Sequence, residues 1–238
     1  MCGIAGLYHP EQPRPLEPAR VAAMLAPMRH RGPDGEGVWN APGVALGHLR
    51  LSIIDVAGSP QPMYSADGRL SIVFNGEVYN FKALRSLLAT RGHKFRTEGD
   101  TEVILAAYAE WGVDCLSRLD GMFAFALFDA ADQSLFLARD RFGVKPLFHT
   151  TLPDGTIAFA SELKGLLTLP QLRVTAQLTA VEDFMAYGFV PDDNCIVAGV
   201  QKLAAGHYLH IRRGLPVPAP VQWWDLDFTR RITVKAKE

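Results

Sequence analysis

Cysteine is scarce in this chain, and its three cysteines, Cys2, Cys115 and Cys195, are widely spaced. An odd number of distant cysteines fits neither a disulfide framework nor a C-x-x-C metal site. The pattern is typical of a reducing, cytoplasmic environment, in which we expect Cys115 and Cys195 to be ordinary buried or partly buried thiols.

Excess charge is also missing. The net charge is −1 over 238 residues, so nothing indicates a nucleic acid or a membrane surface as a partner. No apolar run approaches the length that crosses a bilayer, and the N-terminus lacks the order of a signal peptide. The seven histidines show no metal-ligand spacing, and there is no phosphate-binding loop. We therefore expect no metal, no cofactor and no activation of a substrate by ATP in this chain.

Apolar residues make up 48% of the sequence, which is enough for a sizeable core. Their periodicity predicts helices at about 18–29, 81–92 and 101–111, with shorter helices at 161–167 and 181–187. Strands are predicted at 2–8, 44–51 and 70–74, and hairpins at 122–138 and 147–160. Because strands and helices come in blocks, the pattern favours an α+β fold of stacked antiparallel sheets covered by helices over an alternating parallel fold.

The second residue is the first candidate for chemistry. If Met1 is removed, Cys2 carries both a thiol nucleophile and a free α-amine, with ordinary pKa values of about 8.5 and about 7.7–8.0. A nucleophile activated by the terminal amine is a known variant of nucleophile-plus-base catalysis. A cysteine at this position can equally be an accident of sequence, so the motif needs support from the rest of the chain.

Asn75-Gly76-Glu77 follows the predicted strand at 70–74 and permits two interpretations. Asn-Gly is the commonest hairpin turn, so a tight turn is the default. Alternatively, the amide of Asn75 and a backbone N–H converge on one point and stabilise a tetrahedral oxyanion.

Charged candidates are similarly ambiguous. Arg50 lies among apolar residues, where it either points to solvent from a strand or presents a planar fork to a carboxylate. Asp100 is a natural N-cap for the helix at 101–111, and it could also hold an ammonium group together with Glu77. The charged loop around His30-Arg31-Gly32-Pro33-Asp34 is by default a solvated turn.

Several blocks together resemble one family. They are Met1-Cys2-Gly3-Ile4-Ala5-Gly6, His30-Arg31-Gly32-Pro33-Asp34, Arg50-Leu51-Ser52-Ile53-Ile54-Asp55, Phe74-Asn75-Gly76-Glu77-Val78-Tyr79-Asn80, Gly99-Asp100-Thr101-Glu102, Leu119-Asp120-Gly121-Met122, Ala138-Arg139-Asp140-Arg141-Phe142-Gly143-Val144-Lys145-Pro146 and Phe159-Ala160-Ser161-Glu162. In this order they resemble the class II glutamine amidotransferase domain, and within that family the N-terminal half of glutamine-hydrolysing asparagine synthetase. The resemblance extends to about Trp224.

The resemblance implies an N-terminal-nucleophile hydrolase fold, an αββα sandwich of four layers. It implies that Cys2 attacks the side-chain amide of L-glutamine and that Asn75 and Gly76 form the oxyanion hole. Arg50 would hold the substrate α-carboxylate, and Asp100 with Glu77 the α-ammonium. The backbone of Leu51, Ser52, Ile53 and Ile54 would line the pocket.

The resemblance also implies a division of labour. Residues 2–214 would form the amidotransferase domain, and 215–238, with its proline-rich start and apolar-poor end, a linker to a synthetase domain in cis or in trans. Only that domain would bind ATP and Mg²⁺ and use the ammonia for asparagine synthesis; a homodimer is left open. Two alternatives remain, namely a different acceptor (a sugar, a peptide or a surface-polymer precursor) and a module that binds glutamine without hydrolysing it.

Overall fold

The computed structural model describes residues 1–229, and within them two six-stranded antiparallel sheets lie face to face. The first sheet has the strand order β10-β8-β9-β1-β3-β2. Its strands are β1 (Gly3–Tyr8), β2 (Gly35–Ala41), β3 (Val44–Arg50), β8 (Phe148–Thr151), β9 (Ile157–Ala160) and β10 (Val200–Lys202). The N-terminal strand β1 is therefore central, paired with β3 on one side and β9 on the other.

The second sheet has the order β12-β11-β7-β6-β5-β4. Its strands are β4 (Met63–Tyr64), β5 (Leu70–Val78), β6 (Gly121–Asp129), β7 (Ser134–Arg139), β11 (His207–Arg212) and β12 (Val221–Gln222). Because β4 pairs only with Ser71 and Ile72, one edge of β5 is left without a neighbouring strand beyond residue 72. That edge becomes part of the site described below.

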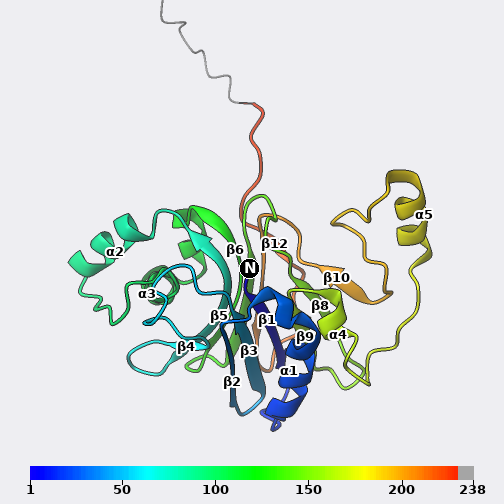
Figure 1. Ribbon diagram of the computed structural model, residues 1–238, viewed down its shortest axis with the longest axis horizontal. Coiled ribbons are helices and arrows are strands. Elements are labelled where there is room, and N and C mark those ends of the chain that lie inside the picture. Colours follow the sequence, from blue (N-terminus) through cyan, green and yellow to red (C-terminus); the bar gives the residue numbers. More distant parts are fainter. Residues whose placement is uncertain (230–238) are drawn as a thin grey trace, which may run out of the picture.

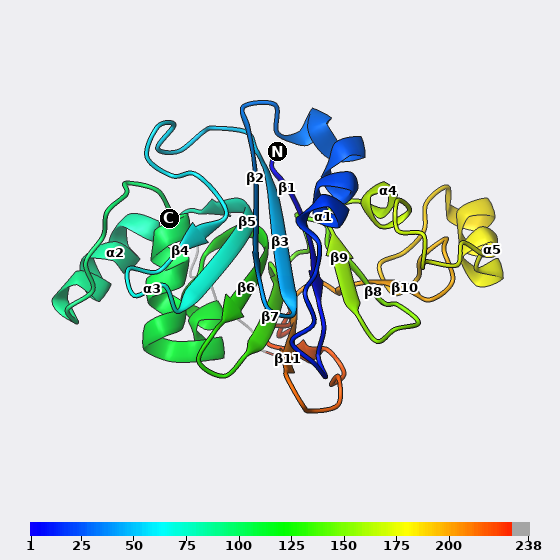
Figure 2. The ribbon, with the colours of Figure 1, turned by 90° about the horizontal axis from the view of Figure 1, so that it is seen from below.

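Helices cover the outer face of each sheet (Figures 1 and 2). They are α1 (Pro18–Leu25), α2 (Phe81–Thr90), α3 (Thr101–Trp111) and α4 (Leu163–Leu166), with the 3₁₀ helices η1 (Ala26–Arg31) and η2 (Gly112–Arg118). A further helix, α5 (Leu178–Tyr187), lies to one side of the sandwich. One apolar cluster joins α1, η1 and α4 to the first sheet, and another joins α2, α3 and η2 to the second. A third cluster fills the space between the sheets, and its largest side chains include Tyr8, Phe128 and Phe159. The predicted αββα sandwich is thus confirmed.

Most predicted elements are present, with shifted ends. The helix expected at 18–29 is α1 followed by the tighter η1, and both hairpins form as β6–β7 and β8–β9. Sequence reasoning missed β2, a half-exposed edge strand that contains two glycines, Gly35 and Gly37, and so shows no clear apolar alternation. It also missed the short strands β4, β10, β11 and β12. These depend on pairing with distant residues and not on a local apolar pattern.

Of the two interpretations of Asn75-Gly76, the tight turn is wrong, as is the expected end of the strand at residue 74. Strand β5 continues through both residues to Val78, and Asn75 pairs with Ala124 and Gly76 with Phe123 on β6. A Cβ atom at position 76 would lie 2.2 Å from the carbonyl oxygen of Met122, so glycine is required by the close approach of β6.

Trp223, shortly after β12, packs on the second sheet. Trp223 lies against Phe123 with ring centroids 6.3 Å apart, and its indole N–H donates to the carbonyl of Arg139. The division expected at residue 214 stays a prediction, and the apolar-poor segment 230–238 lies outside the described residues. No helix within residues 1–229 combines the length and apolar content that a bilayer span needs.

Candidate active site

Cys2 immediately precedes the central strand β1, and its backbone is fixed from two sides. The amide of Ile4 donates to the hydroxyl of Ser161, and Ser161 returns a backbone bond to Ile4. The Nε of Arg31 donates to the carbonyl oxygen of Cys2 at 2.8 Å. Cys2 is therefore attached to a strand that is paired on both sides, with β3 and with β9.

Arg31 is buried and is itself held by a carboxylate. Its Nη1 lies 2.7 Å from Glu162, which also contacts His30 and Lys164 at 3.0 Å. Burial would raise the pKa of the Glu162 carboxyl, but the hydrogen bonds from these three side chains outweigh it and lower the pKa to about 2. The loop expected to be a solvated turn therefore contains a buried arginine that positions Cys2.

The thiol of Cys2 is half-buried and faces the loop after β3. Its Sγ lies 3.4 Å from the amide nitrogen of Leu51 and 3.6 Å from the carbonyl oxygen of the same residue. Burial raises the pKa of this thiol, while the Leu51 N–H and the cations of Arg50 and Arg31 act in the opposite direction. Burial outweighs these groups, so the pKa of the thiol is raised overall, and the N–H donor and the positive charges only partly offset the cost of forming a thiolate here.

Asn75 lies in the wall of the same cavity with no hydrogen-bonding partner. Its side chain is 1% exposed, and both its Nδ2 and Oδ1 atoms are unpaired within residues 1–229. Leaving a buried amide unsatisfied costs about 1–3 kcal/mol. An unpaired amide in the lining of a cavity that a nucleophile also lines is suited to a ligand oxygen that arrives later.

The free edge of β5 adds a second donor. Phe74 donates its N–H to Gln61 Oε1 at 2.7 Å, and Val78 donates its N–H to Asp100 Oδ2 at 2.9 Å. Backbone N–H groups of alternate residues point to the same edge of a strand. The N–H of Gly76 therefore points to the same side, where it and the amide of Asn75 flank the cavity.

One cavity of about 150 Å³ brings most of the predicted residues together. Its lining includes Cys2, Arg50, Leu51, Ile53, Ile54, Asn75, Gly76, Glu77 and Asp100. Ser52 is not among the lining residues; its N–H donates to Asp34 Oδ2 at 2.8 Å. The assignments made from the sequence are therefore neighbours in space, apart from Ser52, although their individual roles stay predictions.

Arg50 and Asp100 stand at the charged end of this cavity. The guanidinium of Arg50 donates to the carbonyls of Asp55 and Val56 at 2.7 Å and thereby shapes the loop 51–62. Asp100 is at the N-cap position of α3, but its side chain makes no cap bond and instead accepts from Val78. Burial, followed by the nearby charge of Glu77, raises the pKa of Asp100. An incoming ammonium would relieve both effects.

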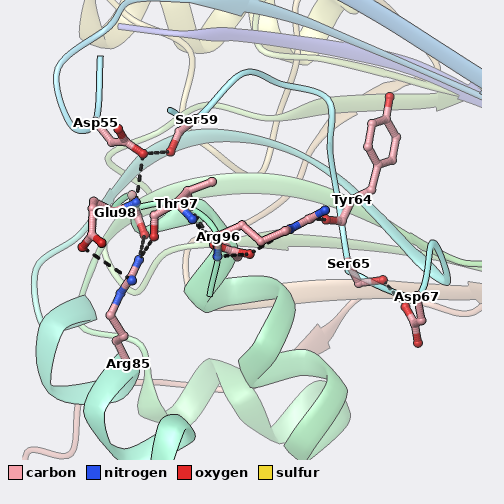
Figure 3. Close-up of polar contacts among 11 residues, drawn as sticks. Asp55, Ser59, Tyr64, Ser65, Asp67, Arg85, Arg96, Thr97 and Glu98 are labelled. Atoms are coloured by element: carbon pink, nitrogen blue, oxygen red, sulfur yellow. Dashed lines mark hydrogen bonds and ion pairs between the residues drawn. The ribbon is translucent and has the colours of Figure 1, made fainter. Parts of the chain in front are cut away.

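The loop 51–62 is tied down on its outer side. Figure 3 shows Asp55 accepting hydrogen bonds from the hydroxyl of Ser59 and the backbone N–H of Glu98, at 2.8 and 3.0 Å. The hydroxyl of Ser59 is the main cause of the lowered pKa of Asp55. This contact fixes the loop to the segment that ends at Asp100, so both walls of the cavity are held in one arrangement.

Sequence reasoning missed several lining residues, including Gln61, Thr101, Met122 and Lys145. Lys145 belongs to a block already noted in the sequence, but nothing in its spacing shows that it reaches Cys2. Among residues 1–229 no group of three or more His, Cys, Asp or Glu side chains is placed to hold a metal ion.

The stacked antiparallel sheets between helical layers, with a cysteine at the start of a central strand, are the architecture of N-terminal-nucleophile hydrolases. A solved glutamine phosphoribosylpyrophosphate amidotransferase from Bacillus subtilis shares this fold, with a TM-score of 0.65 and 20% identity over 94% of this chain and 49% of that one. The chain belongs to the glutamine amidotransferase domain family, whose family model matches residues 1–224.

Curated relatives carry a more specific name. Asparagine synthetase [glutamine-hydrolyzing] 1 of Bacillus subtilis is 39% identical over 214 residues, which are 89% of this chain and 34% of that protein. A putative asparagine synthetase [glutamine-hydrolyzing] of Mycobacterium bovis is 42% identical over 94% of this chain and 37% of that protein. The chain thus spans about a third of the length of these relatives.

Proposed function

We propose that this chain is the glutaminase part of an asparagine synthase, hydrolysing L-glutamine to glutamate and ammonia. One observation supports this above the others: the half-buried thiol of Cys2 and the unpaired amide of Asn75 line the same small cavity. A module that only binds glutamine has no need of a thiol next to an unoccupied donor.

The chemistry begins with removal of Met1. The neutral α-amine of Cys2 takes the thiol proton while the sulfur attacks the γ-carbonyl carbon of glutamine, so that a C–S bond forms and the carbonyl electron pair moves to oxygen. Asn75 Nδ2 and the Gly76 N–H donate to this oxyanion. Losing one such donor typically costs about 2.7–4 kcal/mol of barrier.

Collapse of the intermediate breaks the C–N bond, and the α-ammonium returns its proton to the departing nitrogen, which leaves as ammonia. A γ-glutamyl thioester remains on Cys2. Water then adds to the thioester with its proton passing to the α-amine, the C–S bond breaks, and the thiolate is reprotonated as glutamate leaves. The terminal amine acts first as a base and then as an acid both when the thioester forms and when it is hydrolysed.

The charged end of the cavity selects the substrate. Glutamine carries a carboxylate and an ammonium on the same carbon, and Arg50 faces the one while Asp100 and Glu77 face the other. Pairing both charges of a zwitterion discriminates against amides that lack either group. Ile53 and Ile54 supply backbone and apolar surface beside it, and Ser52 supports the same loop from outside through Asp34.

The ammonia would be used by a synthetase domain, present in cis or in trans. The names of the curated relatives, of whose length this chain spans about a third, support this assignment. ATP and Mg²⁺ belong to that domain in the proposal, because activating the acceptor needs them and the deamidation described above does not. Three free cysteines support a cytoplasmic location.

The test is glutamate release from glutamine by the purified chain, compared with Cys2→Ala. We expect release by the wild type and none by the variant, which should unfold at the same temperature. A glutamine analogue with an electrophilic ketone in place of the amide should label Cys2 even if turnover needs a partner. Absence of both release and labelling would overturn the proposal.

A further inference from the structure

Lys145 places a buried ammonium in the same cavity as Cys2. The residue is 4% exposed, and its side chain lines the cavity from the loop that follows β7. Its Nζ lies 3.3 Å from the sulfur of Met1, which is a weak acceptor. Within residues 1–229, no carboxylate approaches this ammonium to ion-pair distance.

The backbone around Lys145 leaves its side chain little freedom to withdraw. Buried Asp140 accepts hydrogen bonds from the amides of Phe142, Val144 and Lys145, each at 3.0 Å. The carbonyl oxygen of Lys145 accepts from Arg139 Nε at 2.8 Å. The backbone of Lys145 is therefore fixed at both its N–H and its carbonyl group, at a position from which the side chain lines the cavity.

The other two cations near Cys2 are already engaged. Arg31 is paired with Glu162 at 2.7 Å, and Arg50 donates to the loop carbonyls that it shapes. Lys145 has only the sulfur of Met1, and that partner is lost when Met1 is removed. Of the three, Lys145 is thus the cation whose charge is least compensated by direct contacts in the mature protein.

We propose, on the basis of the proposed function, that Lys145 is a positioning residue. Its positive charge stabilises the singly deprotonated form of the N-terminal cysteine relative to the form that carries both an ammonium and a thiol. A nearby cation repels the α-ammonium and attracts a thiolate, so both the neutral amine and the thiolate gain relative to their protonated forms. The active form of Cys2 then predominates at a lower pH than it would beside a neutral side chain.

Other charged groups near Cys2 and Lys145 set the electrostatic background. Arg31 from η1 and Arg50 from β3 add positive charge, while Glu77 from β5, Asp100 before α3 and Asp140 in the Lys145 loop add negative charge. Burial lowers the pKa of Lys145, and Glu77 acts against this. Because replacing Lys145 leaves all five groups in place, the change in proton affinity at Cys2 reports on this one charge.

The experiment compares wild type, Lys145→Met and Lys145→Arg, with Lys94→Met as a control at an exposed lysine in the loop that follows α2. The alkylation rate of Cys2 by iodoacetamide is followed from pH 5 to 9 by peptide mass spectrometry on samples that lack Met1. The pH profile of kcat/KM for glutamine is measured in parallel. Lys145→Gln replaces the methionine variant if that variant fails to fold.

We expect Lys145→Met to move the midpoint of both profiles up by about one pH unit and to slow alkylation at pH 7 about tenfold. Lys145→Arg and Lys94→Met should keep the wild-type midpoint. An unchanged midpoint in Lys145→Met, whatever its overall rate, would overturn the inference. If the wild type releases no glutamate, the proposed function fails, but the alkylation profile still decides the role of Lys145.

Discussion

His48 on β3 donates a hydrogen bond from Nε2 to the carbonyl oxygen of Phe74 on β5, at 3.0 Å, and so joins the two sheets next to Asn75. The imidazole is fully buried, and its Nδ1 has no partner within residues 1–229. Since the acceptor is a carbonyl, Nε2 must carry a proton, and burial, which lowers the pKa of His48 to about 4, keeps the ring neutral near pH 7. This contact fixes the free edge of β5, from which the amide of Asn75 enters the cavity.

The buried histidines predict loss of stability in mild acid. Burial lowers the pKa of His48 from 6.5 to about 4, and that of His149 likewise. Unfolded chains take up these protons at about pH 6.5 and the folded protein only near pH 4. The contribution of these histidines to the free energy of unfolding should therefore be constant above pH 6.5. It should fall between pH 6.5 and 4, by up to about 3 kcal/mol per histidine.

Urea unfolding at a series of pH values measures this effect. His48→Gln keeps an N–H donor without the titration, so its stability should decline less steeply with acid than that of the wild type. His207→Gln, at a half-buried histidine bonded to the nearby Ala205 carbonyl, serves as the matched control. Equal slopes for His48→Gln and wild type would show that the protonation of His48 is not coupled to folding.

Asn75→Ala tests the oxyanion donor. We expect kcat for glutamine hydrolysis to fall by roughly a hundredfold or more, since one donor to the transition state is lost. KM should change little, and thermal unfolding should stay close to wild type because no hydrogen bond within the described structure is broken. Steady-state kinetics and a melting curve on the same sample separate these effects. A rise in KM alone would assign Asn75 to substrate binding instead.

The local patterns predicted the layers of the fold well. Helices such as α3 and hairpins such as β6–β7 are encoded by apolar periodicity and by Gly112 at a helix end, which adopts φ +57°. Edge strands such as β2 could not be predicted, because their residues are half-exposed and their pairing is decided by β3. The Asn75-Gly76 dipeptide was ambiguous for a related reason. Its own preference is a turn, but pairing with β6 extends β5 through both residues.

The site shows a similar limit. Cys2, Asn75 and Asp100 were identifiable because their residue types fit the chemistry and the blocks fit a family. Arg31, Gln61 and Lys145 were not, because each acts through a contact with a residue that is distant in sequence. Asp100 illustrates the difference most clearly, since its position predicts a helix cap while its carboxylate binds the backbone of β5.

Removal of Met1 is required if the terminal amine is the base. Mass spectrometry of active protein should show a chain that begins at Cys2. A variant with lysine inserted between Met1 and Cys2 should retain its extension, because bulky second residues block excision, and it should release no glutamate while folding normally. Wild-type turnover by the extended chain, with its extension verified intact, would exclude the α-amine of Cys2 from the mechanism.

Gly76→Ala should harm both the fold and the reaction. The added methyl group would lie 2.2 Å from the carbonyl oxygen of Met122 and 2.7 Å from the Cα of Phe123, and backbone atoms cannot move aside as a flexible side chain would. Overpacking of this kind typically costs about 1–3 kcal/mol. Separation of β5 from β6 would also turn the Gly76 N–H and the amide of Asn75 away from Cys2.

Gly35→Ala is the matched control for this change, because the added Cβ meets nothing nearer than Arg50 Cβ at 3.7 Å. Its unfolding midpoint in urea should be at or above that of the wild type, since alanine restricts the unfolded chain more than glycine does. Gly76→Ala should show a lower midpoint and reduced glutaminase turnover in the fraction that remains folded. Wild-type stability with normal turnover in Gly76→Ala would mean that β5 and β6 are less closely packed around the site than the contacts of Met122 and Phe123 require.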